Sequence, residues 1–229
     1  MREFLSDPLY LGWLIILVVD GIIMGLLALA VTSKRYSRYR IRTPASYRIP
    51  FGRKVVTISF NMLLSVGFLL MVMTVFRDRL VHDGSAGGVL IFGEVLAALL
   101  FYDFMYFFMH RAMHHPRLMR YVHGVHHKVR YPTSPESIYV HPFENIAGLT
   151  LLMVAVMVMG PVSIASFLIT FFIHSTANIL VHSNLEFPHP AFKLFNFWAK
   201  KHDLHHGRYR NRNYASIFPF WDMMFGTYA

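Results

Sequence analysis

The chain has 229 residues, of which 55% are hydrophobic, and its mean hydropathy is +0.42. Because the apolar residues come in long blocks, this composition excludes an ordinary soluble domain and predicts an integral membrane protein. There is no cysteine, which excludes disulfides, iron–sulfur clusters and thiolate-ligated haem and leaves His, Asp or Glu to hold any metal. The net charge of +10 comes from basic residues between the apolar blocks, a positive-inside pattern that argues against a nucleic-acid partner.

The first apolar block, about residues 9–31, is long enough to cross a bilayer and has no evident cleavage site. We therefore expect a retained membrane anchor rather than a signal peptide. Its one charged residue, Asp20, is costly in lipid, so we expect it to face another helix or a polar pocket. Residues 34–54 carry eight basic side chains and no acid, which predicts a cytoplasmic loop.

The next two predicted spans are about residues 55–76 and 88–109, and the second of them runs directly into His110. Asp103 lies seven residues before His110, on the same face of the predicted helix. A carboxylate there is expected to accept a hydrogen bond from a metal-binding imidazole of His110 and so to orient it. The alternative is an interhelical hydrogen bond of Asp103 without any metal.

A further apolar stretch, residues 146–181, is interrupted by Gly160 and Pro161 and fits either one kinked helix or two short helices. A single crossing would separate the histidines of residues 202–206 from those of residues 110–127 by about 30 Å of hydrocarbon. We therefore predict a hairpin with spans at 146–159 and 161–181. The expected fold is an all-α membrane bundle of four to five transmembrane helices in one domain, 1–229, with a cytoplasmic histidine-rich cap formed by 110–144 and 183–229.

Three histidine motifs share one design: HRAMHH begins at residue 110, HGVHH at 123 and HDLHH at 202. Residues three and four apart share a helix face, so each motif is expected to point two or three imidazoles in one direction. Nine imidazoles exceed what one four- to six-coordinate ion needs, which favours two metal ions. The candidate ligands are His110, His114, His115, His123, His126, His127, His202, His205 and His206.

Three more histidines are candidates because of their positions. His182 ends the last apolar block beside the cytoplasm and is the strongest of them. His174 lies on the same helical stripe, where a ligand role and an ordinary interhelical hydrogen bond are equally good interpretations. His141, with Glu144 one turn later, is a ligand, a partner of a ligand, or neither.

An all-nitrogen ligand set suits iron, copper or zinc, so ligand type alone leaves the metal open. A site at a membrane surface meets lipids with unactivated C–H bonds, and breaking these requires activated O2, which favours two iron ions (Fe2+/Fe3+) with O2 as co-substrate. Two other hypotheses are a non-catalytic metal binder or transporter and a bis-histidine haem protein. The first requires more polar residues in the spans, and the second leaves most histidine doublets unexplained.

These motifs resemble the histidine boxes of the fatty acid hydroxylase and sterol desaturase superfamily of membrane di-iron oxygenases. The resemblance extends over about residues 101–227 and includes HPFEN (141–145), HSNLEFP (182–188) and the ending NYASIFPFWDMMFGT (213–227). It implies an O2-dependent lipid hydroxylase, or alternatively a desaturase, in which the box histidines and His182 are ligands or neighbours of ligands. Either His114 or His115 is then free to lie outside the metal sphere, and Glu144 is expected to orient His141.

The resemblance also implies a separate electron-donor protein, such as a cytochrome, a ferredoxin or a Rieske-type protein, because no fused haem domain is expected. Fatty acyl lipids, aminolipids, sterol-like lipids and carotenoids all remain open as substrates. We expect a multi-pass protein with its histidines on the cytoplasmic side of a bacterial inner membrane, with the endoplasmic reticulum as the alternative. The oligomeric state is left open.

Overall fold

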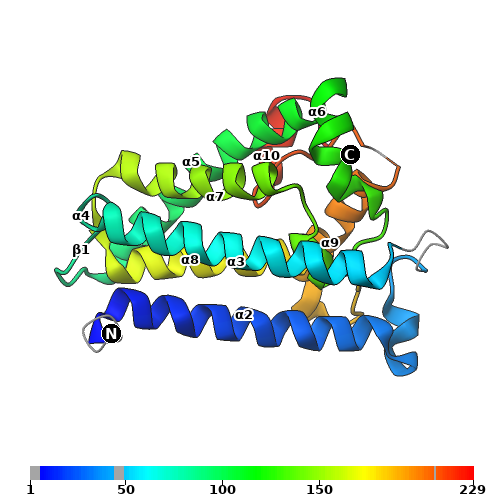
Figure 1. The fold of residues 1–229 in the computed structure, drawn as a ribbon, viewed down its shortest axis with the longest axis horizontal. Helices are drawn as coiled ribbons and strands as arrows, with labels where there is room; N and C mark the ends of the chain where they lie inside the picture. The colour runs from blue at the N-terminus through cyan, green and yellow to red at the C-terminus, as the bar shows by residue number, and fades with distance from the viewer. Residues whose placement is uncertain (1–5, 44–48, 209) are drawn as a thin grey trace.

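The computed structural model describes residues 6–43, 49–208 and 210–229. Within these ranges, five helices are long and apolar enough to cross a membrane, and Figure 1 shows them lying side by side. They begin and end within about one turn of the expected spans. The chain is therefore an all-α, multi-pass membrane protein, as predicted. The five helices are α2 (Pro8–Thr32), α3 (Phe51–Val75), α5 (Gly88–Met113), α7 (Pro142–Met159) and α8 (Ile164–Val181).

The outer surface of the bundle carries many large apolar side chains. Helix α2 exposes a row of large side chains that includes Leu11, Ile15 and Ile22, and its most apolar stretch is only 17% buried. A helix that is apolar all round suits lipid rather than water. Asp20 is the exception on α2, and it is buried against α8, where its Oδ1 accepts a hydrogen bond of 2.8 Å from the Thr176 hydroxyl. Asp20 thus faces another helix, as expected because exposing its charged side chain to lipid would be energetically unfavourable.

Two separate helices, and not one kinked helix, occupy residues 142–181. Gly160 has a φ of +83°, a conformation that ends α7, and the chain then turns into α8. Each of the two helices has 18 residues, about 27 Å. Between them β2 (Val162–Ser163) pairs in parallel with β1 (Val81–His82), a short contact that the sequence did not predict.

Short helices form a cap at one end of the bundle (Figure 1). The basic loop before residue 44 is attached to this cap, since the Glu186 N–H donates to the Tyr39 carbonyl at 2.7 Å and the Ile41 N–H to the Asn184 carbonyl at 3.1 Å. The elements at this end are η1 (Lys34–Tyr39), α6 (Pro116–Tyr121), η2 (His123–Lys128), η3 (Ser134–Ile138), η4 (Pro190–Phe192), α9 (Lys193–His206) and α10 (Pro219–Met224).

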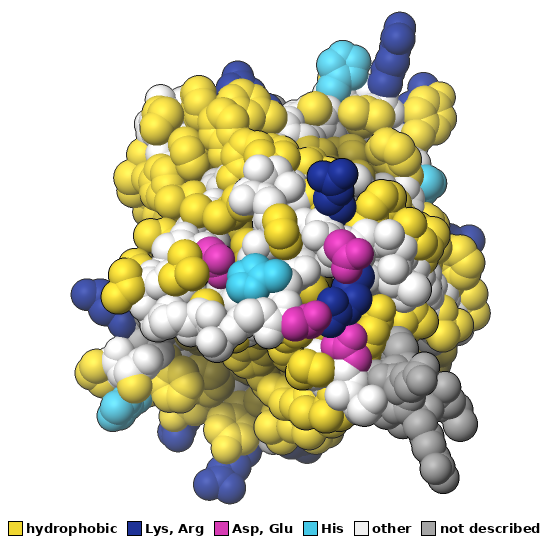
Figure 2. Space-filling model, turned by 90° about the vertical axis from the view of Figure 1, so that its left-hand side faces the viewer, with side chains coloured by type: hydrophobic (Ala, Val, Ile, Leu, Met, Phe, Trp, Pro, Cys, Tyr) yellow, Lys and Arg dark blue, Asp and Glu magenta, His cyan; other side chains and the backbone are white. Residues whose placement is uncertain are grey.

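The opposite end of the bundle carries the N-terminus, β1 and α4 (Arg77–Leu80). Figure 2 shows acidic and basic side chains together near the centre of this face, surrounded by hydrophobic ones. Arg77 makes ion pairs there with Asp7 at 3.1 Å and with Asp83 at 2.6 Å. The two ends of the bundle therefore differ in charge, because the basic segment is joined to the histidine-bearing end.

Candidate metal centre

Nine buried or half-buried histidines come together in the cap, within the part of the chain that the structure describes. They form two groups, and within each group the ligand nitrogen atoms lie within 4.8 Å of one another. We call these the first group and the second group. The first group contains His110, His114, His123, His127 and His205, and the second contains His126, His182, His202 and His206.

Two of the three histidine motifs, those that begin at residues 123 and 202, contribute to both groups. His110 and His114, four residues apart at the end of α5, belong to the first group, and His202 and His206, four apart on α9, belong to the second. The remaining histidine of the α9 motif, His205, turns to the first group. The expectation that each motif points in one direction therefore holds for residues four apart, which share a helix face, but not for the whole motif.

The spacing of the imidazole nitrogens suits metal ions. Contacts between Nε2 atoms within the groups range from 2.8 Å for His202 and His182 to 3.2 Å for His110 and His123. Two nitrogens bound about 2.1 Å from one ion and at right angles to each other lie about 3.0 Å apart. The observed distances therefore match neighbouring ligands of a shared ion.

The opposite ring nitrogen shows why these contacts are not ordinary hydrogen bonds. The Nδ1 atoms of His110, His205 and His182 each lie 2.7 Å from a backbone carbonyl oxygen, which can only accept a hydrogen bond. These Nδ1 atoms therefore carry the proton, and the neutral ring presents its Nε2 lone pair to the group. Lone pairs that face one another repel, and a cation between them turns the repulsion into ligation.

Burial keeps the histidines outside the membrane spans neutral. Loss of hydration, together with a smaller effect of neighbouring imidazoles, lowers the pKa of His114 and His126 to about 3, and loss of hydration lowers that of His182 to about 4. The same causes place the pKa of every other cap histidine for which a shift is resolved below its ordinary value; these are His127, His202, His205 and His206. At neutral pH these imidazoles are ready to bind metal without losing a proton.

Three of the predicted ligands lie outside both groups. His115 is exposed and caps α6, with its Nδ1 accepting from the Arg117 N–H, because the chain leaves α5 at His114 and Pro116 starts a new helix. His141 caps α7 in the same way. The Nε2 of His174 is 2.9 Å from the Tyr102 hydroxyl, which is the interhelical hydrogen bond considered as its alternative role.

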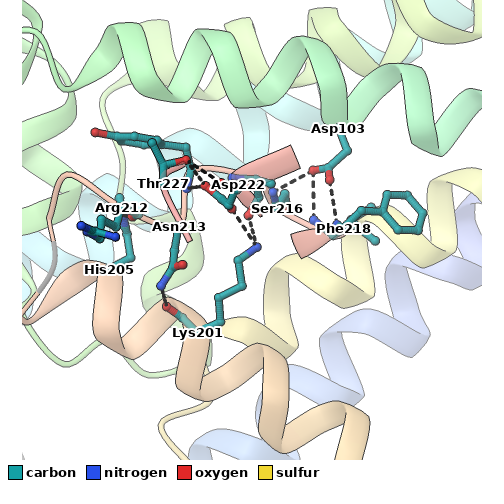
Figure 3. Close-up of polar contacts among 12 residues, drawn as sticks. Asp103, Lys201, His205, Arg212, Asn213, Ser216, Phe218, Asp222 and Thr227 are labelled. Carbon is teal, nitrogen blue, oxygen red and sulfur yellow. Dashed lines mark hydrogen bonds and ion pairs between the residues drawn. The ribbon is translucent and has the colours of Figure 1, made fainter. Parts of the chain in front are cut away.

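The predicted partnership between Asp103 and His110 is wrong. Seven residues are about 10.5 Å along a helix, beyond the reach of a hydrogen bond. Asp103 instead accepts three backbone N–H groups, from Ser216 at 2.7 Å, Ile217 at 2.9 Å and Phe218 at 2.7 Å (Figure 3). It anchors the segment whose Tyr214 carbonyl holds His110, so its effect on that ligand is indirect.

The predicted partnership between Glu144 and His141 is also wrong. Glu144 Oε1 accepts a hydrogen bond of 2.7 Å from Nδ1 of His123, the histidine whose Nε2 contacts three others of the first group. A carboxylate partner fixes the ring and makes it a better ligand. Its other oxygen, Oε2, has no hydrogen-bond partner among the described residues.

A network around the C-terminal segment was not predicted. Asp222 is fully buried and accepts from the backbone N–H groups of Tyr214 and Ala215, while the Lys201 ammonium lies 3.5 Å away (Figure 3). Burial lowers the pKa of Lys201, and Asp222 opposes this shift. The signal that could have indicated the network is Asp222, a single acid within an apolar and aromatic segment, because a buried charge requires partners.

Cavities extend from the histidines into the membrane part of the bundle. The pocket beside them is lined by residues that include His110, His202, Glu144 and Asn178. Asn178 and Ser137 also line a larger cavity of about 900 Å³, with its open mouth included, between α2, α3, α7 and α8. The mainly apolar cavity of the bundle and the more polar pocket beside the histidines thus share Ser137 and Asn178 as lining residues.

Comparison with known proteins identifies the family to which the histidine motifs belong. The family described as fatty acid hydroxylase matches residues 95–227. Methylsterol monooxygenase 1 of Rattus norvegicus is 34% identical over 131 residues, which are 55% of this chain and 43% of that protein. The Arabidopsis thaliana protein CER1-like 1 is 34% identical over 149 residues, 59% of this chain and 23% of that protein.

The chain thus spans less than half the length of each of these relatives. No solved structure matches it. The family match covers more than half of the chain and contains all nine histidines of the two groups. The chain therefore belongs to the fatty acid hydroxylase family.

Proposed function

We propose that this chain is a membrane di-iron oxygenase that uses O2 to hydroxylate a lipid at an unactivated C–H bond. The observation that carries the proposal is the convergence of imidazole lone pairs in two adjacent groups beside a largely apolar cavity. Membership of the fatty acid hydroxylase family and the similarity to methylsterol monooxygenases support an oxidoreductase that acts on lipids.

The residues of the chain hold the metal and keep it in place. Backbone carbonyls fix the tautomers of His110, His205 and His182, and the Glu144 carboxylate would balance part of the positive charge of a metal ion in the first group. Two iron ions bound there would supply the one-electron chemistry that activates O2 and attacks a C–H bond. Burial of the imidazoles excludes bulk water from this chemistry.

The substrate we propose is a fatty acyl, aminolipid or sterol-like molecule. The larger cavity has walls that are mainly apolar, including Leu17, Met62 and Phe171. Its connection to the histidine pocket through Ser137 and Asn178 would bring an alkyl carbon to the metal groups from the membrane side. Desaturation of the same lipid is the second candidate, since it begins with the same C–H bond.

We propose that residues 1–229 form a single membrane domain with its histidine cap on the cytoplasmic side. The basic segment attached to the cap and the mixed charge of the other end (Figure 2) support this orientation by the positive-inside rule. A bacterial inner membrane is our first choice and the endoplasmic reticulum our second. Electrons would come from a separate cytochrome, ferredoxin or Rieske-type protein.

Comparative lipid mass spectrometry of cells with and without the chain tests the proposal. Hydroxylation adds one oxygen atom to a lipid, and desaturation removes two hydrogen atoms. His126→Ala and His205→Ala should each abolish the product while the protein remains in the membrane, and His189→Ala, at an exposed position in the cap, should not. Iron bound by the purified protein without any new lipid in the cells would favour the metal-binder hypothesis instead.

A further inference from the structure

The C-terminal segment, residues 210–229, holds two histidines through backbone carbonyls. The Arg212 carbonyl accepts from Nδ1 of His205, and the Tyr214 carbonyl accepts from Nδ1 of His110, both at 2.7 Å. Both histidines belong to the first group. Asn213, between the two carbonyls, has a φ of +59°, a turn conformation that asparagine tolerates.

The second group is held by other parts of the chain. Three of its four Nδ1 atoms, those of His182, His206 and His126, donate to the carbonyls of Asn178 at 2.7 Å, Val129 at 3.1 Å and Tyr139 at 3.4 Å. These carbonyls lie in α8 and in the segment after η2, far from the C-terminus in sequence. The backbone carbonyls that hold the imidazoles therefore come from different parts of the chain in the two groups.

Asp222 fixes the part of the C-terminal segment that contacts the first group. Its Oδ1 accepts from the Tyr214 N–H at 2.7 Å and from the Thr227 hydroxyl at 2.9 Å, and its Oδ2 accepts from the Ala215 N–H at 3.0 Å. Tyr214 is thus bound on its N–H side by Asp222 and on its carbonyl side by His110. The side chain of Asp222 is completely buried, so water cannot replace these bonds.

We propose that Asp222 is a positioning residue for the first group alone: through the Tyr214 and Arg212 carbonyls it sets the tautomer and direction of His110 and His205. The inference rests on the proposed metal centre and specifies how one half of it is supported. If Asp222 only stabilised the fold, its loss would weaken metal binding by both groups equally. If Asp222 positions His110 and His205, its loss weakens metal binding by the first group only.

Metal titration of the full-length protein in detergent micelles tests this difference. Co2+ serves as the spectroscopic probe, and wild type is compared with Asp222→Asn. We expect one of the two binding steps to weaken about 10–100-fold, the usual effect of losing a partner that orients a ligand, while the other step stays within about threefold. Glu186→Gln, which removes an acid from a half-exposed ion pair with Lys200, should leave both steps unchanged.

A milder variant guards against loss of folding. Asn213→Gly preserves the positive φ but removes the side-chain hydrogen bonds to Lys201 and Ala229, so it should weaken the same step to a smaller extent. If both steps weaken equally in Asp222→Asn and in Asn213→Gly, or if neither step changes, Asp222 is not a positioning residue for one group.

A readout without metal separates this inference from the proposed function. In the metal-free protein, modification by diethyl pyrocarbonate followed by peptide mass spectrometry reports the accessibility of each histidine. Asp222→Asn should accelerate modification of His110 and His205 about tenfold, the effect of one lost hydrogen bond to a charged group, and leave His182 and His206 protected. If wild type bound no metal, the proposed function would fail, but this pattern would still decide the role of Asp222. Equal modification of both groups would overturn it.

Discussion

Replacing Glu144 by Gln keeps the shape of the side chain and an acceptor oxygen for His123 but removes the negative charge. The bond between Glu144 Oε1 and His123 Nδ1 is 2.7 Å long, typical of a charge-assisted hydrogen bond, and His123 is only 1% exposed. A hydrogen bond to a charged group contributes about 1.5–3 kcal/mol and a neutral one about 0.5–1.5 kcal/mol. The difference of about 1–1.5 kcal/mol predicts that metal affinity of the first group falls roughly tenfold.

Glu144→Ala removes the acceptor completely and leaves a buried N–H without a partner. The cost is then about 2–3 kcal/mol, or roughly 100-fold in affinity, at the upper end of the range known for such partners of metal ligands. The graded order of wild type, Gln and Ala distinguishes a role in ligand orientation from a simple loss of packing, because Gln and Glu have nearly the same volume.

Metal titration and lipid product yield, measured on the same preparations, provide the assay for this series. Glu186→Gln is the matched control, since its carboxylate is 43% exposed and such pairs contribute only about 0–1 kcal/mol. Metal affinities of Glu144→Gln and Glu144→Ala equal to that of wild type would refute the role of Glu144 in orienting His123. Equal losses of affinity in the two variants would refute a separate effect of its charge.

Other predictions concern the cap. Gly124→Ala should prevent metal binding, because a Cβ there would lie 2.2 Å from the Met119 carbonyl oxygen and force η2 to shift; near-normal metal content in this variant would contradict the packing. His115→Ala should retain both metal ions and the lipid product, and loss of one ion by elemental analysis would return His115 to the ligand set. The metal-free protein should lose stability as pH falls from about 6.5 toward 4, because the unfolded chain then binds protons at His126 and His182 that the folded chain excludes. A thermal midpoint at about pH 5 equal to that at about pH 8 would disprove this.

The membrane architecture could be predicted because lipid imposes simple rules on sequence. A helix in hydrocarbon must satisfy its own backbone and be apolar for about 20 residues, so the spans are visible as blocks of hydropathy. Short elements outside this rule were not visible. The pairing of Val81 with Val162 joins two loops by backbone hydrogen bonds, which depend little on which side chains are present.

The partners of the site residues were harder to predict than the ligands. Spacing along a helix indicated where Asp103 and Glu144 lie relative to their own neighbours, but each accepts from a distant segment. The groups that bind Asp103 are backbone N–H donors more than 100 residues away, in an irregular segment that has no helical partners for them. A buried carboxylate satisfies the strongest unpaired donors that the fold brings to it, and the fold decides which these are.

The histidine doublets explain why this arrangement has two groups and not one. Adjacent residues point about 100° apart on an α-helix and about 120° apart on a 3₁₀ helix, so His205 and His206 on α9, and His126 and His127 on η2, cannot face the same ion. Each of these two doublets in fact sends one imidazole to each group. Because η2 and α9 both contribute to both groups, the backbones of these two short helices set the separation of the two groups. A distortion of either helix must therefore disturb both groups together, whereas the Arg212 and Tyr214 carbonyls of the C-terminal segment hold histidines of the first group only.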